Sequence, residues 1–349
     1  MKPSEITSIL VVLSAALCLA LGAGDVALAQ VQTDVVAAAR QEGSVTWYTN
    51  PGFRQPMKEA IEEWGRRYPQ IELKIVEATG ADVAERVRAE RSAGKVTADV
   101  VTLGDTVAYS LAASKALIPL DRAKLANFAN VIPRLAAFAN FENGYLPTLL
   151  FAYGINVNTR HLSEAEIPHS WSDLANPRYA GKIGVPDFGR PGGANTWMTI
   201  GMQPLGQEFF KGLMKQKPRV FSSPQELDAA VVRGERAIAA PSRTRVAKDY
   251  AGAPIRFILP QDGIFVVVMQ SGIVNGSTHP NAAYLLLNFL LDPVAQRAIA
   301  AVGDVPVIQG VTTPVDFATA KFLGEGRITP AEMPRQKEVM EFGKTLMQR

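Results

Sequence analysis

The sequence predicts an α/β fold, in which a parallel sheet carries helices on its faces. Strand-like and helix-like segments alternate from residue 44 onward, and the same alternation returns in the second half of the chain. With 47% hydrophobic and 20% charged residues, the composition is that of a globular protein with a large core. The length of 349 residues suits one large or two medium-sized domains.

The first half of the chain predicts three strands, each followed by a helix. Apolar and polar residues alternate at residues 71–75, as in a strand, and the helix at 55–68 carries Met57 and Trp64 on one face. The other elements are strands at 44–48 and 98–103, helices at 81–93 and 106–116, and a turn at 49–52. In such sheets, ligands bind beyond the carboxyl ends of the strands. Here those ends are Thr49-Asn50 and Asp105-Thr106.

The second half of the chain repeats the pattern, with strands predicted at residues 149–156, 182–186, 236–240, 255–259 and 265–274. Ser223-Pro224 and Thr329-Pro330 each combine an N-cap, a proline at the first helical position and a capping-box glutamate, so each predicts a helix start. A long apolar helix is predicted at 281–302, with a kink at Pro293.

The first 29 residues resemble a targeting segment. An apolar run at residues 9–24 is followed by the small-x-small site Ala27-Leu28-Ala29, which predicts a cleavable signal peptide over 1–29 and a periplasmic product; an uncleaved anchor is the alternative. Cleavage would remove Cys18, the single cysteine, which already excludes a disulfide framework and a cysteine-based metal centre. A net charge of +3 gives no indication of a nucleic-acid partner.

Catalytic and cofactor motifs are missing from the sequence. The histidines, His161, His169 and His279, lack the spacing of a metal site and are expected in surface loops. No serine lies in a G-x-S-x-G elbow, and no G-x-G-x-x-G follows a predicted strand. The sequence therefore predicts a binding protein, not an enzyme, with no cofactor and no metal.

Seven short motifs in order make the chain resemble the extracellular solute-binding proteins of ABC importers, closest to the branch of ferric-ion, thiamine and aminoethylphosphonate binders. The motifs are GSVTWY at residues 43–48, ADV at 98–100, WSDLANP at 171–177, YAGKIG at 179–184, VRGE at 232–235, GAPI at 252–255 and NFLLDPVAQ at 288–296.

The resemblance implies a type II periplasmic binding fold, with two α/β lobes, two crossover strands and a ligand cleft between the lobes. The crossovers are expected near residues 150–153 and 259–264. Lobe 1 would comprise residues 30–151 and 264–349, and lobe 2 residues 152–263. The implied partners are a small-molecule ligand and the permease subunits of an ABC transporter, and the protein is expected to be a monomer.

The residues at the implied site differ from those of ferric-ion binders, which use a histidine after the first strand, a glutamate after the third and a tyrosine pair after the Gly-Glu strand. This sequence has Asn50 in the first place, Gly104 and then Asp105 in the second, and Arg243 and Thr244 in the third. Arginine side chains repel a cation, so ferric ion is the second choice of ligand.

A small organic anion is the first choice of ligand. Arg243, next to Ser242, is expected to bind a carboxylate, phosphonate or sulfonate with its planar fork. The Gly-rich loop that includes Gly193-Ala194-Asn195-Thr196 precedes a helix expected from about Trp197, whose start offers free N–H groups. Tyr153 would form the floor of the cleft, and Asp105 would pair with an amine on the ligand. Plain structural roles stay open for these residues: a solvated helix face for Arg243, an N-cap for Asn195, core packing for Tyr153 and a helix cap for Asp105. A secreted enzyme and a sensory module on the same scaffold are alternatives of another class.

Overall fold

The computed structural model describes residues 30–50, 53–54, 57–189, 193–313, 315–317 and 319–348. The predicted signal peptide, the turn residues 51–52, the start of the helix predicted from Gln55 and the loop residues 190–192 lie outside this part. The described chain opens with helical residues 30–42. Within the described residues, no helix is both long and apolar enough to cross a membrane.

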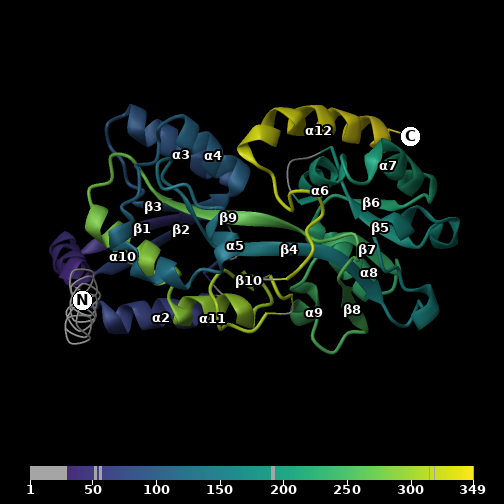
Figure 1. The fold of residues 1–349 in the computed structure, drawn as a ribbon, viewed down its shortest axis with the longest axis horizontal. Coiled ribbons are helices and arrows are strands. Elements are labelled where there is room, and N and C mark those ends of the chain that lie inside the picture. Colours follow the sequence, from purple (N-terminus) through teal and green to yellow (C-terminus); the bar gives the residue numbers. More distant parts are fainter. Residues whose placement is uncertain are drawn as a thin grey trace, which may run out of the picture.

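The strands form one continuous sheet in the order β2-β1-β3-β9-β4-β7-β5-β6, with β8 and β10 also pairing with β4 (Figure 1). The strands are β1 (Ser44–Thr49), β2 (Glu72–Glu77), β3 (Val100–Gly104), β4 (Leu146–Asn158), β5 (Ile183–Pro186), β6 (Arg219–Phe221), β7 (Ile238–Arg243), β8 (Ile255–Ile258), β9 (Phe265–Ile273) and β10 (Val305–Pro306). The α/β class is confirmed, and the sheet that was expected to be parallel is mixed. Pairs β1–β2, β1–β3, β5–β6 and β5–β7 are parallel, whereas β4 and β9 run antiparallel to their neighbours.

The predicted helices are confirmed to within a few residues. The helices of the structure are α2 (Lys58–Arg67), α3 (Gly80–Ser92), α4 (Asp105–Ala113), α5 (Pro133–Ala136), α6 (Gly193–Gly201), α7 (Gly206–Lys215), α8 (Pro224–Val232), α9 (Val246–Asp249), α10 (Pro280–Leu290), α11 (Pro293–Ala301) and α12 (Met333–Met347), of which α5, α7 and α9 were not predicted. The N-cap prediction for Ser223 is confirmed, since its hydroxyl accepts from the Glu226 N–H. The chain breaks before Pro293 into two helices, because Asp292 caps α11 by accepting from the Val294 N–H.

Strands β4 and β9 are the two long strands that connect the halves of the molecule (Figure 1). The first part of β4 pairs with β9 and its last part with β7 and β8. The second crossover begins at Phe265, after the predicted range 259–264, because the Gly263 N–H closes a turn on the Pro260 carbonyl. One hydrophobic core gathers residues before position 153 and from 264 to 320, and another is built mainly from residues 155–240.

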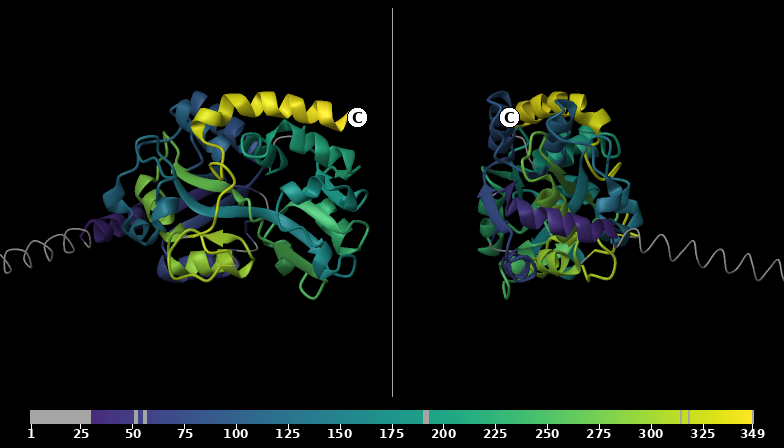
Figure 2. Two further views of the ribbon diagram at one scale, coloured as in Figure 1. Left: turned by 45° about the vertical axis from the view of Figure 1, so that its right-hand side comes forward. Right: turned by 90° about the vertical axis from the view of Figure 1, so that its left-hand side faces the viewer.

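The C-terminal helix α12 packs on the second core, although residues 264–349 were expected in lobe 1. Figure 2 shows α12 lying along one edge of the molecule above α6 and α7. Val339 and Leu346 are buried in the second core, and α12 contacts α6. Gly343 permits this approach, since a Cβ there would lie 2.7 Å from the carbonyl oxygen of Phe188. The structure thus places α12 with residues of the expected lobe 2.

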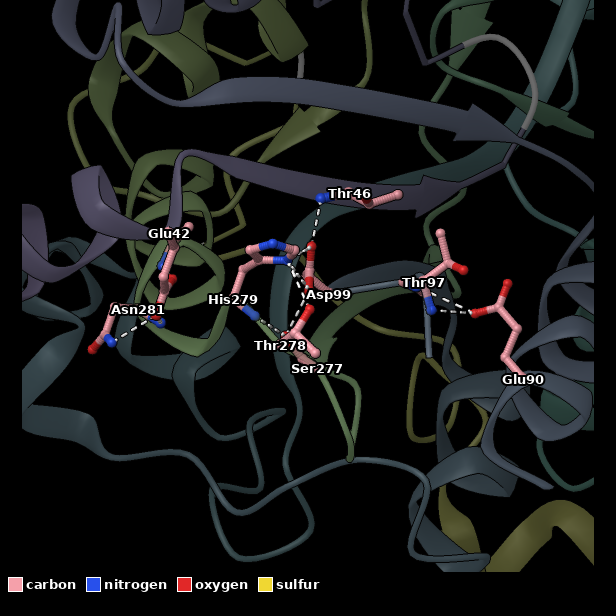
Figure 3. A network of polar contacts seen from close by, with 11 residues as sticks. Glu42, Thr46, Glu90, Thr97, Asp99, Ser277, Thr278, His279 and Asn281 are labelled. Atoms are coloured by element: carbon pink, nitrogen blue, oxygen red, sulfur yellow. Dashed lines mark hydrogen bonds and ion pairs between the residues drawn. The ribbon is translucent and has the colours of Figure 1, made fainter. Parts of the chain in front are cut away.

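A buried polar network anchors the end of β3 that is remote from α4 (Figure 3). Asp99, 1% exposed, accepts hydrogen bonds from the Thr46 N–H at 2.7 Å and the Ser277 hydroxyl at 2.6 Å. Its carboxylate also lies 3.1 Å from Nδ1 of His279. The expectation of a surface-loop histidine is wrong for His279, which is half-buried and holds the start of α10 to this network.

Candidate functional site

Two adjoining cavities lie over one face of the crossover strands. The first, which we call the helix-end cavity, has a volume of about 520 Å³ and is lined by residues that include Thr79, Asp105, Tyr153, Asn195, Val267 and Lys337. The second, the arginine cavity, has a volume of about 490 Å³ and is lined by residues that include Phe53, Leu149, Arg243, Arg245, Asp249 and Asp304. Asn50 and Phe151 line both cavities, so Phe151 forms a ridge between them.

Three helices begin at the wall of the helix-end cavity. Gly80 starts α3, Asp105 starts α4 and Gly193 starts α6, and all three residues line the cavity. The first N–H groups of a helix have no partner within it, and the helix dipole adds partial positive charge at the same end. Lys337 of α12 adds a full positive charge at the rim. The cavity therefore favours a negatively charged ligand.

Buried polar atoms in the helix-end cavity lack hydrogen-bond partners. Asp105 and Asn195 are 2% and 1% exposed, respectively. Among the residues that the structure describes, Asp105 Oδ2, Asn50 Oδ1, and both Oδ1 and Nδ2 of Asn195 have no partner. Because buried polar groups in folded proteins are nearly always hydrogen-bonded, these atoms indicate a polar ligand. The predicted residues that line this cavity are Asn50, Asp105, Thr106, Tyr153, Gly193, Asn195 and Thr196.

Asp105 is the acidic residue of the helix-end cavity. Its Oδ1 accepts from the Thr106 N–H at 2.8 Å, which makes it the first-turn acid of α4. Burial raises the pKa of this carboxyl to about 7, against the opposing effects of the Thr106 N–H and the positive charge of Arg327. The side chain therefore titrates near neutral pH and can either donate a hydrogen bond as an acid or accept one as a carboxylate.

The buried Asp105 predicts a loss of stability with rising pH. Because the pKa of Asp105 is higher in the folded than in the unfolded protein, the free energy of unfolding is highest below the unfolded pKa of 3.8. It falls as the pH rises from there through about 7. We expect Asp105→Asn to raise the free energy of unfolding at pH 8 by about 4 kcal/mol and to leave it nearly unchanged at pH 4. Urea unfolding of both proteins at the two pH values tests this. An equal effect at both pH values would contradict it.

Tyr153 forms the floor of the helix-end cavity beside the start of α6. Its ring stacks on Phe265 with centroids 4.7 Å apart and planes at 8°. A Cβ on Gly193 would lie 2.6 Å from the tyrosine oxygen, so glycine allows α6 to begin against this ring. Burial raises the pKa of Tyr153, which keeps the phenol neutral. The side chain can therefore offer a hydroxyl next to the first residues of α6.

The arginine cavity contains two arginines with different surroundings. Arg245 forms ion pairs with Asp249 at 2.9 Å and with Asp304 at 3.3 Å. Arg243 lies over the ring of Phe151, 5.1 Å from its centroid, and has no ion-pair partner among the described residues. Register places Arg243 directly opposite Tyr153, so both side chains leave the same face of the sheet.

Three of the predicted site residues lie outside the walls of both cavities. Thr49, Ala194 and Ser242 are buried behind them. The Ser242 hydroxyl donates to Asp228 at 2.8 Å and accepts from the Asn156 amide at 2.9 Å. Strand alternation explains why Ser242 points away from the cavity. Neighbouring side chains in β7 point to opposite faces, and the side chain of Arg243 points to the cavity.

The sequence prediction missed the contribution of α12. Gln336, Lys337 and Met340 line the helix-end cavity although they follow Asn195 by more than 140 residues. Their i, i+1, i+4 spacing on one helix face was available in the sequence, but nothing there showed that this face meets the cleft. Thr79 and Gly80 were also missed; the N-cap Thr79, which accepts from the Asp82 N–H, was the available signal.

Among the described residues, no group of three or more His, Cys, Asp or Glu side chains is placed to hold a metal ion. The same holds for the described residues that line the two cavities.

Comparison with known proteins gives consistent matches. The family of bacterial extracellular solute-binding proteins matches residues 96–324. A curated relative, spermidine/putrescine-binding periplasmic protein 1 of Haemophilus influenzae, is 27% identical over 217 residues, which are 59% of this chain and 60% of that relative.

Solved structures share the fold. Iron-bound HitA from Pseudomonas aeruginosa has a TM-score of 0.69 and 18% identity, over 87% of this chain and 99% of that one. An extracellular solute-binding protein from Bordetella parapertussis, described as putative, has a TM-score of 0.71 and 15% identity, over 88% and 98% of the two chains. At these identities the likeness concerns the fold, which is that of the type II periplasmic binding proteins.

Proposed function

The chain belongs to the family of bacterial extracellular solute-binding proteins, and from this premise we propose that it is the periplasmic binding component of an ABC importer for a small organic anion. A carboxylate, phosphonate or sulfonate is the class of ligand that the cleft favours. The protein binds this ligand without chemical change and presents it to the membrane permease.

The observation that carries this proposal is the convergence of three helix starts on one cavity that also holds unpartnered buried polar atoms. Helices α3, α4 and α6 begin with residues that line the same space, so the positive ends of three helix dipoles lie there. The side chains of Asn195 and Asp105 present further hydrogen-bonding atoms there. An oxyanion would satisfy the N–H groups and the Asn195 amide together.

The proposed mechanism is closure of two lobes around the ligand. We propose that lobe 1 consists of residues 30–151 with 264–322, and lobe 2 of residues 152–263 with 323–348. Strands β4 and β9 connect them and would act as the hinge. Helices α3 and α4 would contact the ligand from lobe 1 and α6 from lobe 2, so the ligand itself would join the lobes.

Ferric ion is the second candidate, since iron-bound HitA shares the fold. Fe(III) favours several hard carboxylate and phenolate oxygens, of which the helix-end cavity offers those of Asp105 and Tyr153, and the adjoining cavity adds the guanidinium of Arg243. A polyamine is a third possibility that the curated relative raises. Both are cations and would have to lie beside three helix N-termini, which disfavours them.

A thermal-shift screen tests the proposal. The panel contains carboxylates, phosphonates, sulfonates, thiamine, spermidine and Fe(III) with and without carbonate. We expect an organic anion at a hundred times its Kd to stabilise the protein by about 3 kcal/mol. A panel in which only Fe(III) or spermidine raises Tm would contradict the proposal.

The Asn195→Ala variant separates binding from folding. The Asn195 amide has no partner to lose, so the unliganded variant should be as stable as the parent or slightly more stable. Its affinity for the anion should fall about tenfold, because a hydrogen bond to a charged group is lost. Lys344→Gln, on the outer part of α12 where Lys344 pairs with Glu341, is the control and should bind like the parent. Destabilisation of the unliganded Asn195→Ala protein with unchanged affinity would contradict this role.

A further inference from the structure

We infer that the ligand is a dianion whose two charged groups are joined by an apolar spacer, with one group in the helix-end cavity and the other at Arg243. This inference rests on the proposed function and extends it to the class of substrate. The supporting observation is that two adjoining cavities differ in their chemistry: one lies at three helix N-termini, and the other contains Arg243.

The first step is that the two cavities can hold one molecule. They have Asn50 and Phe151 in common, and both lie over the same face of β4. Leu149 lines the arginine cavity, Phe151 lines both and Tyr153 lines the helix-end cavity, which is the i, i+2, i+4 row of a single strand face. The cleft floor therefore continues from one cavity to the other across the Phe151 ring.

The second step is that Arg243 lacks an acceptor. A guanidinium carries five N–H donors in a planar fork, and that of Arg243, which lies half-buried over Phe151, makes no hydrogen bond or ion pair with the described residues. Both oxygens of the neighbouring Asp249 bond to Arg245, whereas Asp304 bonds to Arg245 through Oδ2 at 3.3 Å and its Oδ1 has no partner among the described residues. A carboxylate or sulfonate on the ligand would supply the missing acceptor with bidentate geometry.

The third step concerns what lies between the two charged ends. Phe53 and Phe151 have ring centroids 6.3 Å apart, and Met57 and Leu149 complete an apolar wall of the arginine cavity. Phe53, Met57 and Leu149 are each less than 10% exposed. Such a wall favours an aliphatic or aromatic spacer over a polar one. The observations together specify an apolar dicarboxylate or a similar dianion.

Matched pairs of acids test this inference by isothermal titration calorimetry. Terephthalate is compared with 4-methylbenzoate, and each dicarboxylate from succinate to suberate with the monocarboxylate of equal length. We expect at least one diacid to bind more than tenfold more tightly than its monoacid. If monoacids bind and no diacid binds more tightly than its partner, this inference is wrong while the proposed function stands. If no anion binds and a cation does, the proposed function fails as well.

Two variants assign the ends of the ligand. Arg243→Gln should weaken the preferred diacid at least tenfold and leave the matched monoacid within twofold of the parent, whereas Asn195→Ala should weaken both acids. Arg243→Lys keeps the charge but loses the fork and should restore part of the affinity. Arg66→Gln, at an exposed site on α2, is the matched control without effect. Equal weakening of monoacid and diacid by Arg243→Gln would overturn the assignment.

Discussion

Affinity for an organic anion should fall about a hundredfold between pH 6 and pH 9, because Asp105 has to be protonated beside a negative ligand. Its pKa is raised to about 7 by burial, so the acid form dominates at pH 6 and is scarce at pH 9. The acid can donate a hydrogen bond from Oδ2, whereas the carboxylate repels the anion. Carboxylates and sulfonates stay fully ionised over this range, so the profile reports the protein.

The Asp105→Asn variant should remove this pH dependence. Asparagine keeps the acceptor for the Thr106 N–H and provides a permanent donor in place of the acid. The charged groups near Asp105 are Arg327, Glu332 and the rim residue Lys337, and the substitution leaves all three in place. Titration calorimetry at four pH values with terephthalate or adipate measures the profile. An affinity that rises with pH would show that the cavity binds a cation.

Asp99→Ala should lower the free energy of unfolding by about 3 kcal/mol, because the buried carboxylate joins three segments of the chain. The variant would leave the Thr46 N–H of β1 without its 2.7 Å acceptor and would free Ser277 and His279 before α10 (Figure 3). Buried donors without acceptors carry the full cost of their desolvation.

His279→Ala is the matched comparison. His279 is 29% exposed on its side chain, and its loss leaves Asp99 with two other donors, so we expect a cost of about 1 kcal/mol. Urea unfolding monitored by tryptophan fluorescence measures both variants. Equal losses for the two variants would contradict the central place of Asp99 in this network. Anion affinity of folded Asp99→Ala should change little, since Asp99 lies at the far end of β3 from Asp105.

The order of strands and helices could be predicted because local patterns determine it. Alternation identified β2, and caps identified the start of α8. Pairing between distant segments could not be predicted in the same way. The antiparallel insertion of β9 between β3 and β4 depends on long-range register, which no short window of sequence contains.

The candidate site was predictable in part for the same reason. Residues at strand ends and helix starts, such as Asp105 and Asn195, could be assigned to one edge of the sheet, and they do line one cavity. Arg243 was expected in the same cleft, and the Phe151 ridge places it in the adjoining cavity. Lys337 was missed because the packing of α12 on α6 depends on Val339 and Leu346 finding the second core.

The charge of the bound group is tested most directly by counting protons. Terephthalate is titrated into the protein at pH 7 in two buffers of different ionisation enthalpy, and the difference in heat gives the number of protons exchanged. Because an anion favours the acid form of Asp105, binding should take up about half a proton per ligand, and the Asp105→Asn variant should take up much less, since Asp304 of the arginine cavity, with its pKa raised to about 6, is mostly ionised at pH 7. Release of protons when terephthalate binds would contradict anion capture. It would also be contradicted if Fe(III) or spermidine bound with release of protons while terephthalate and the other anions gave no heat.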